Sequence, residues 1–169
     1  ALFEAEERPD AGLRNAEIVL SGAQLLENVH AVQRSRNLPL SAKLASSAAA
    51  PGAPNLDVEM ETGTGKTYVY IKTIMELHKR YGWSKYIIVV PSVAIKEGVY
   101  KSLQITEEHF KSMYAGVPVD FFLYDSSKLG QVRNFATSAS IQVMVMTVQS
   151  IVRKDYAVVY KDSEKTGGE

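Results

Sequence analysis

Apolar residues recur at helical spacing near the amino end of the chain. The positions that carry this spacing are Leu13, Ile18, Leu25, Val29 and Val32. They predict a helix over residues 13–37, with a weak point at Ser21-Gly22. Residues 39–55 that follow are rich in Ala, Ser and Pro. Such a segment buries too little apolar area to offset the entropy of ordering it, so we expect a mobile linker.

After the linker, short apolar runs alternate with amphipathic stretches. The predicted strands are residues 56–61, 86–90, 119–124 and 141–147. The predicted helices are residues 66–81, 93–103, 107–114 and 128–136, and a further helix starts within 148–154. Connections of this length allow right-handed crossovers between parallel strands. The order of elements therefore predicts an α/β fold, with a parallel sheet and helices on both of its faces.

The first predicted strand is unusual because acidic residues occupy alternate positions in it. These residues are Asp57, Glu59 and Glu61. A parallel strand that is buried on both faces is almost entirely apolar. Two interpretations stay open: Glu61 lies near a metal–phosphate pocket or pairs with a basic group, or this end of the strand meets water.

Composition narrows the possible chemistry. The 169 residues include no cysteine, which excludes a disulfide, a thiolate zinc site, an iron–sulfur cluster and a cysteine nucleophile. Lys and Arg total 19, as do Asp and Glu, so a polybasic tail is excluded but a local basic groove is not. No apolar run approaches the ~20 residues that span a bilayer, and no secretory signal is evident. We therefore expect a cytoplasmic protein without a membrane partner.

The most informative segment is the Gly-rich turn at residues 61–67, ETGTGKT. It stands between a predicted strand and a predicted helix, in the order that a nucleotide phosphate loop requires. Gly63 and Gly65 can adopt backbone angles that other residues avoid, so that successive N–H groups point at phosphate oxygens. The helix that starts at Lys66 directs its positive end at the same anion.

Two side chains of this turn are the candidate catalytic residues. Lys66 would reach the β- and γ-phosphates of a nucleotide, and the Thr67 hydroxyl would ligate the Mg²⁺ that bridges them. Met60 occupies the position where phosphate loops usually begin with glycine. Many ATPases have another residue there, so Met60 restricts the match to a subfamily of P-loop ATPases. The residues expected to bind the nucleotide are Thr62, Gly63, Thr64, Gly65, Lys66 and Thr67.

Residues 55–110 resemble the motor of the restriction (Res) subunit of Type III restriction–modification enzymes. The blocks that carry the resemblance are VEMETGTGKTYVYIKTI and YGWSKYIIVVPSVAIKEGV. The resemblance covers roughly residues 55–152, and a fainter similarity lies around Gln24–Gln33. Members of this family are superfamily-two, helicase-like translocases with two RecA-like lobes and usually a C-terminal nuclease domain. The resemblance implies ATP and Mg²⁺ as cofactors, and double-stranded DNA and a DNA-methylating (Mod) subunit as partners. It also implies ATP-driven translocation or switching on duplex DNA before cleavage.

The residue pattern and the resemblance together divide the chain into three parts. Residues 1–38 are an N-terminal helical segment, residues 39–55 are the flexible linker, and residues 56–169 are a partial first RecA-like lobe of the P-loop NTPase class. Gln24 corresponds to an adenine-reading glutamine that lies upstream of the phosphate loop in relatives. The alternative for Gln24 is an exposed helix residue without this role.

Two further loops match motifs that touch the DNA backbone in relatives. Pro91 and Ser92 follow the strand at 86–90, and Thr147 ends the strand at 141–147. Both loops stand at the carboxyl ends of parallel strands, where open α/β sheets bind ligands. As an alternative, Ser92 and Thr147 cap the helices that follow them.

Phosphoryl transfer also needs an acid that holds Mg²⁺, a group that positions water and usually an arginine finger. The resemblance places the acids in an Asp-Glu-x-His or Asp-Glu-x-Gln motif, which residues 115–169 lack; Asp155 comes nearest by position. We therefore expect an incomplete lobe from a longer protein, inactive by itself. The alternatives are another superfamily-two DNA helicase, and a nucleotide-gated binding module that does not hydrolyse ATP.

Overall fold

The computed structural model describes residues 13–46 and 53–152. They form two compact units, which divide after Ala16 and again after Thr64. The larger unit holds residues 13–16 and 65–152, and the smaller unit holds the described part of residues 17–64. Each unit is described by itself.

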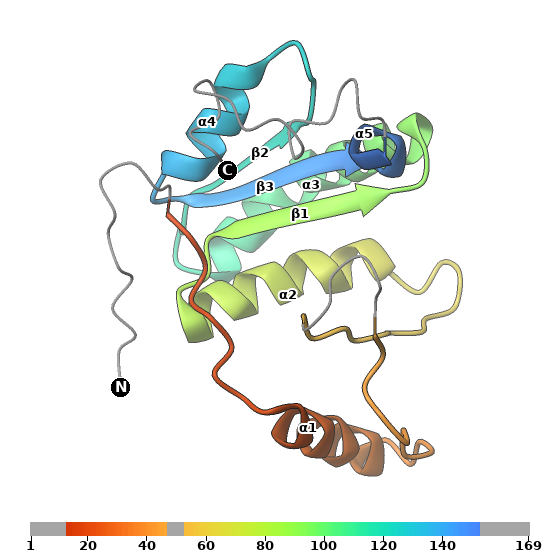
Figure 1. The fold of residues 1–169 in the computed structure, drawn as a ribbon. Coiled ribbons are helices and arrows are strands. Elements are labelled where there is room, and N and C mark those ends of the chain that lie inside the picture. The colour runs from red at the N-terminus through yellow and green to blue at the C-terminus, as the bar shows by residue number, and fades with distance from the viewer. Residues whose placement is uncertain (1–12, 47–52, 153–169) are drawn as a thin grey trace. The chain divides into compact units, whose positions relative to one another are not determined.

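The larger unit is a parallel sheet with helices on both faces (Figure 1). Its strands are β1 (Lys85–Val90), β2 (Val119–Leu123) and β3 (Ile141–Thr147). Its helices are α2 (Lys66–Tyr81), α3 (Val93–Met113), α4 (Leu129–Thr137) and α5 (Val148–Val152). The strand order is β1-β3-β2, so the last strand in sequence lies between the two earlier ones.

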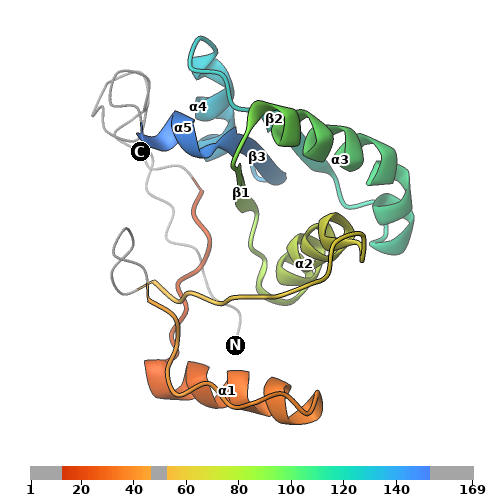
Figure 2. The same cartoon turned by 90° about the vertical axis from the view of Figure 1, so that its right-hand side faces the viewer.

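The central strand β3 separates two apolar layers, because every residue from Ile141 to Thr147 is buried. Alternate side chains of a strand point to opposite faces. Val143 and Val145 pack in the layer that α2 and α3 cover. Met144 and Met146 pack in the layer with residues of α4 and α5. Figure 2 shows the sheet between these two pairs of helices.

The amino ends of the strands are joined by side-chain hydrogen bonds. Asn15 Oδ1 accepts from the backbone N–H groups of Ser84 (2.8 Å) and Lys85 (2.9 Å), and Asn15 Nδ2 donates to the Lys85 carbonyl at 2.7 Å. The Gln142 side chain, which is 1% exposed, donates through Nε2 to Asp120 Oδ2 at 2.7 Å. The Asn15 contacts therefore hold the start of β1 against residues 13–16, and the Gln142 contact joins the starts of β2 and β3, on which Asp120 and Gln142 lie.

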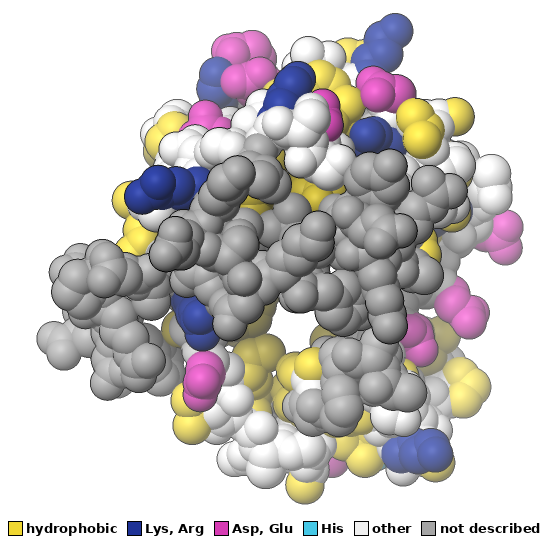
Figure 3. Space-filling model, turned by 45° about the horizontal axis from the view of Figure 1, so that its top comes forward, with side chains coloured by type: hydrophobic (Ala, Val, Ile, Leu, Met, Phe, Trp, Pro, Cys, Tyr) yellow, Lys and Arg dark blue, Asp and Glu magenta, His cyan; other side chains and the backbone are white. Residues whose placement is uncertain are grey.

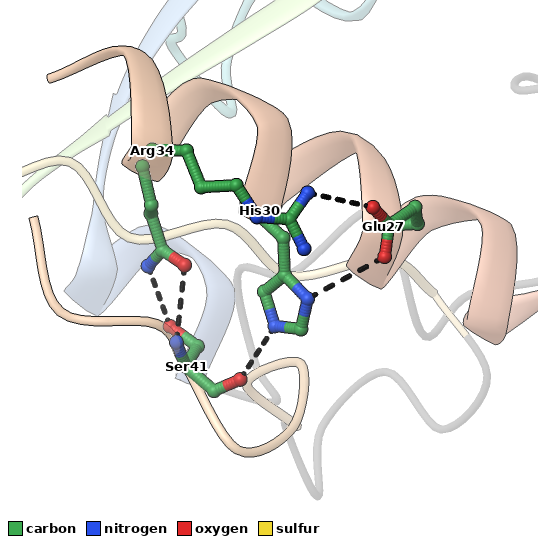
Figure 4. Close-up of polar contacts among 5 residues, drawn as sticks. Glu27, His30, Arg34 and Ser41 are labelled. Atoms are coloured by element: carbon green, nitrogen blue, oxygen red, sulfur yellow. Dashed lines mark hydrogen bonds and ion pairs between the residues drawn. The ribbon is translucent and has the colours of Figure 1, made fainter. Parts of the chain in front are cut away.

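The smaller unit contains helix α1 (Gly22–Ser35). Ser21 and Gln24 form a capping box at its amino end, so the predicted weak point is the start of the helix. His30 Nε2 lies 2.8 Å from the Ser41 carbonyl, and Glu27 pairs with Arg34 at 2.8 Å (Figure 4). The helix therefore holds the segment that follows it through polar contacts rather than through a buried apolar core.

The predicted α/β class is confirmed, and most predicted elements occur within one or two residues of their expected limits. The prediction of a helix over 13–37 was too long, because residues 13–21 are not helical. The helices predicted at 93–103 and 107–114 are one helix, α3. Residues 104–106 contain neither Gly nor Pro to break it, and the Thr106 hydroxyl donates back to the Ser102 carbonyl at 2.8 Å.

The prediction of a strand at 56–61 is wrong. Residues 56–61 have no regular secondary structure, and Leu56 and Val58 are 60% and 75% exposed. Asp57, Glu59 and Glu61 are exposed as well, which agrees with the interpretation that this segment meets water. Burying such alternate carboxylates in a parallel sheet would carry a large desolvation cost.

The described residues of the predicted linker, 39–46 and 53–55, form an isolated antiparallel bridge between Ala45 and Asn55. Within the ranges 13–46 and 53–152, no helix combines the length and apolar character needed to cross a membrane.

Candidate nucleotide and nucleic-acid sites

The second half of the phosphate loop leads directly into helix α2. Gly65 is the N-cap residue and adopts a left-handed conformation, with φ of 88° and ψ of 31°. No side chain caps this helix end in the described part of the chain. The first-turn N–H groups therefore keep the arrangement that favours an anion. Lys66 is exposed and Thr67 is half-buried at this end.

The first half of the loop is shaped by its own backbone. Gly63 also adopts a left-handed conformation, with φ of 82°. The Thr64 hydroxyl donates to the Glu61 carbonyl at 2.7 Å, and the Thr64 N–H donates to the same oxygen at 3.4 Å. The turn thus has the backbone conformations predicted for Gly63 and Gly65, the two positions where a side chain would add strain.

The two predicted DNA loops are neighbours at the carboxyl edge of the sheet. Val90 and Thr147 are paired residues at the ends of β1 and β3, so both loops begin at the same level. Gln149 Nε2 donates to the Pro91 carbonyl at 3.2 Å, which joins the two loops. Their expected position at the ends of parallel strands is confirmed.

Both hydroxyls of these loops already make local contacts. Ser92 is the N-cap of α3, and its Oγ accepts from the Ile95 N–H at 3.3 Å. Thr147 Oγ1 lies 3.0 Å from Ser150 Oγ, and the Thr147 residue is 5% exposed. Capping, the alternative for Ser92, is therefore observed, and DNA contact at Pro91, Ser92 and Thr147 stays a prediction.

A groove of about 540 Å³ lies beside these loops. It is bounded by residues at or after the carboxyl end of each of the three strands, among them Lys96, Asp125, Ser126, Lys128, Thr147 and Gln149. Sequence reasoning did not select Lys96, although it lies within the block YGWSKYIIVVPSVAIKEGV, and it did not select Lys128, which lies outside both blocks. The available signal was their position, within one or two turns after the end of a predicted strand.

The charge in this groove is balanced locally. The Ser127 hydroxyl and N–H donate to Asp125 Oδ1 at 2.7 and 2.9 Å. These hydrogen bonds, with smaller contributions from the positive charges of Lys128 and Lys96, hold the pKa of Asp125 below its usual value. Asp125 is therefore a carboxylate at neutral pH and faces both lysines.

Gln24, the predicted adenine reader, uses its side chain locally in the smaller unit. Its Oε1 accepts from the Ser21 N–H at 2.9 Å and lies 3.0 Å from the Ser21 hydroxyl. The capping box accounts for this side chain, and adenine recognition by Gln24 stays a prediction.

Asp155, the acid nearest by position to the expected catalytic motif, lies outside the described residues. Among the residues that the structure describes, no three His, Asp or Glu side chains form a group that could hold a metal ion.

Parallel sheet, flanking helices and a glycine-rich turn at a helix start together define a P-loop NTPase domain, the partial RecA-like lobe that was predicted. A family model described as "Type III restriction enzyme, res subunit" matches residues 23–168. The chain belongs to this family.

Three similar proteins are named as Res subunits of Type III restriction-modification enzymes. The chain is 35% identical over 125 residues to the Type III restriction-modification enzyme StyLTI Res subunit of Salmonella typhimurium (strain LT2), covering 60% of this chain and 12% of that protein. It is 40% identical over 104 residues to the EcoP15I Res subunit of Escherichia coli, covering 60% and 10%. It is 51% identical over 61 residues to the EcoPI Res subunit of Escherichia phage P1, covering 35% and 6%. The chain thus spans about a tenth or less of the length of these relatives.

Proposed function

We propose that this chain is the ATP-binding part of the DNA motor of a Type III restriction enzyme Res subunit. In the whole enzyme, the motor would couple hydrolysis of Mg-ATP to translocation or switching on duplex DNA before cleavage. Its partners would be double-stranded DNA and the Mod subunit. Family membership supports the class of enzyme, and the phosphate loop supports the role of this part of it.

The conformation of the phosphate loop carries the proposal. Two left-handed glycines, Gly63 and Gly65, lead into a helix whose amino end no side chain of the described residues caps. A capping side chain would compete with a phosphate for the first-turn N–H groups, and a glycine at the cap has no side chain that could do so. Lys66 would place a positive charge on the β- and γ-phosphates, and Thr67 would ligate Mg²⁺.

The chain by itself would bind Mg-ATP without turning it over. The phosphate loop stabilises the bound nucleotide, but hydrolysis also requires acidic residues and an arginine that stabilise the transition state. Residues 115–169 contain no Asp-Glu-x-His or Asp-Glu-x-Gln motif. Titration of the chain with a fluorescent ATP analogue and Mg²⁺, together with a phosphate-release assay, would measure the two activities separately.

The decisive test changes Lys66 to Ala in the full-length Res subunit, assembled with its Mod subunit. We expect ATP hydrolysis and ATP-dependent DNA cleavage to fall by at least about 100-fold, the effect of removing one transition-state charge contact. Assembly with the Mod subunit should be unchanged. Lys72→Ala is the matched control, because Lys72 is exposed on the same helix α2. Hydrolysis that survives in Lys66→Ala would show that this loop is not the nucleotide site.

A further inference from the structure

The hydroxyl group of Tyr70, on helix α2, is buried without a partner. Among the residues that the structure describes, it is the one buried side-chain nitrogen or oxygen atom that makes no hydrogen bond. The hydroxyl of Tyr86, in contrast, donates to the carbonyls of Ile74 and Trp83 at 3.1 and 3.0 Å. Buried polar groups are nearly always paired, so the single exception calls for a physical explanation.

The geometry of α2 directs the Tyr70 side chain toward the start of the helix. Its ring packs against the apolar layer that α2 and α3 share with the sheet. Long side chains on a helix lie toward its amino end and cover the residues three and four positions earlier. Thr67 stands three positions earlier, in the first turn of α2. The Tyr70 hydroxyl is therefore at the level of the side chain that we expect to ligate Mg²⁺.

The hydroxyl groups of Tyr70 and Thr67 are neighbours. Burial raises the pKa of Tyr70 above its usual value, and the nearby Thr67 side chain offsets part of this rise. An effect of this kind is short-ranged, so the two groups lie close together. They do not meet the geometry of a hydrogen bond, and rotation of one side chain would complete it. The raised pKa keeps Tyr70 protonated and uncharged at neutral pH.

The Thr67 hydroxyl differs from those of other threonines in helices of this chain. A helical threonine has two accessible rotamers, because its hydroxyl can donate to a backbone carbonyl three or four residues earlier. Thr73, Thr106 and Thr137 donate to the carbonyl four residues earlier, at 2.8, 2.8 and 3.0 Å. Thr67 makes no bond of this kind among the described residues. Its rotamer is therefore not fixed by the backbone, and a neighbouring side chain can select it.

We propose that Tyr70 positions the Thr67 hydroxyl for Mg²⁺ through a hydrogen bond between the two hydroxyl groups. The proposal rests on the proposed function and deepens it, since it names the residue that orients the expected metal ligand. The Thr67 oxygen presents a lone pair to the metal, and its O–H donates to the Tyr70 oxygen. A partner of this kind behind a metal ligand fixes its orientation and raises the metal affinity. Tyr70 is a positioning residue, because it acts through Thr67.

The distribution of surface charge makes such local contacts important. Lys and Arg side chains lie beside Asp and Glu side chains on the face drawn in Figure 3, without one extended basic patch among the described residues. The formal net charge of the chain is zero. The described side chains of that face therefore create no broad positive field that would attract a nucleotide. We expect the metal and its ligands to contribute a measurable part of the nucleotide affinity.

The test measures how much Mg²⁺ tightens nucleotide binding. A fluorescent ADP analogue is titrated into the full-length Res subunit, assembled with its Mod subunit and without DNA, once with Mg²⁺ and once with EDTA. The ratio of the two dissociation constants is called the metal factor. The variants are Tyr70→Phe, Thr67→Val, their combination, and Tyr68→Phe. Tyr68→Phe is the matched control, because it removes the same atom from another tyrosine of α2, whose hydroxyl lies 2.9 Å from His109 Nε2.

We expect Tyr70→Phe to lower the metal factor about tenfold, the lower end of the effect of removing a partner behind a metal ligand. Binding in EDTA should stay unchanged, because Phe keeps the packed ring, and this also shows that the site is folded. Thr67→Val should lower the metal factor at least as much. Adding Tyr70→Phe to Thr67→Val should change the factor by less than about twofold, since the two residues act as one unit. Tyr68→Phe should leave the factor unchanged.

Three results would overturn the proposal. The first is a metal factor in Tyr70→Phe equal to that of Tyr68→Phe. The second is an equal loss of binding with Mg²⁺ and with EDTA, which indicates a structural role. The third is full addition of the two effects in the combined variant. Failure of the proposed function is distinguishable, because Lys66→Ala would then bind the nucleotide as tightly as the unchanged enzyme, and that result would overturn both proposals. Weaker binding by Lys66→Ala with an unchanged metal factor in Tyr70→Phe would overturn this proposal alone.

Discussion

Asn15 holds the start of β1 through three hydrogen bonds to a segment about 70 residues away in sequence. Replacing Asn15 by Ala removes all three and leaves the N–H groups of Ser84 and Lys85 without this partner. Each bond contributes about 0.5–1.5 kcal/mol net. Asn15, Ser84 and Lys85 are only half-buried, so water replaces part of the loss.

We therefore expect Asn15→Ala to lower the free energy of unfolding by about 2 kcal/mol, near the lower end of that range for three bonds. The midpoint of thermal unfolding should fall by about 4–8 °C. Urea unfolding of the chain, followed by circular dichroism, would measure the change. Only the midpoint should move, since the buried area exposed on unfolding stays nearly the same.

Asn134→Ala is the matched control, because Asn134 is exposed on α4 and removal of its amide should leave stability almost unchanged. If Asn15→Ala destabilises the chain no more than this control does, the three hydrogen bonds do not hold the sheet edge. A change in the slope of the urea transition would contradict the reasoning in another way, because it would mean that segment 13–16 unfolds separately.

Three other changes test separate parts of the structure. Gly65→Ala should destabilise the chain by about 1 kcal/mol and weaken Mg-ATP binding, because Gly65 has φ of 88°. Gly98→Ala, inside α3, should instead stabilise the chain slightly. Equal effects of the two changes on the free energy of unfolding would contradict the role of the left-handed conformation at Gly65. Burial raises the pKa of Tyr86 to about 12 from the usual 10. The unfolded chain then loses this proton first, so stability should be complete below about pH 10 and fall as pH rises toward 12. Unfolding curves of Tyr86→Phe should show a smaller alkaline loss, and an equal loss would exclude Tyr86 as its source. Asp120→Ala should cost about 1–2 kcal/mol by removing an acceptor from buried Gln142; Asp120→Asn, which keeps one oxygen, should lose less in the same urea assay.

The elements that sequence predicted closely are those whose limits coincide with a local signal. Helix α2 begins after Gly65 and ends before Gly82, and both glycines adopt left-handed conformations that favour this residue. Strand β3 is a continuous apolar run, which a buried parallel strand requires. The phosphate loop belongs to the same group, because its signal lies within residues 61–67.

The features that sequence did not predict depend on contacts between distant residues. The segment at 56–61 alternates apolar and acidic residues, but a strand also needs a partner to accept its hydrogen bonds, and no local signal supplies one. Lys96 and Lys128 share a groove only because the strand order is β1-β3-β2. The contacts of Asn15 with Ser84 and Lys85 likewise depend on the folded sheet.

The strand order also has a consequence for synthesis of the chain. Among the described residues, β1 and β2 do not pair with each other, and each pairs with β3 alone, which begins at Ile141. Because the ribosome adds residues in order, the edges of β1 and β2 stay unpaired until β3 has been synthesised. Unpaired strand edges are the parts of a nascent chain that bind wrong partners most readily. Chaperone protection during that interval would therefore matter more for this domain than its modest size suggests.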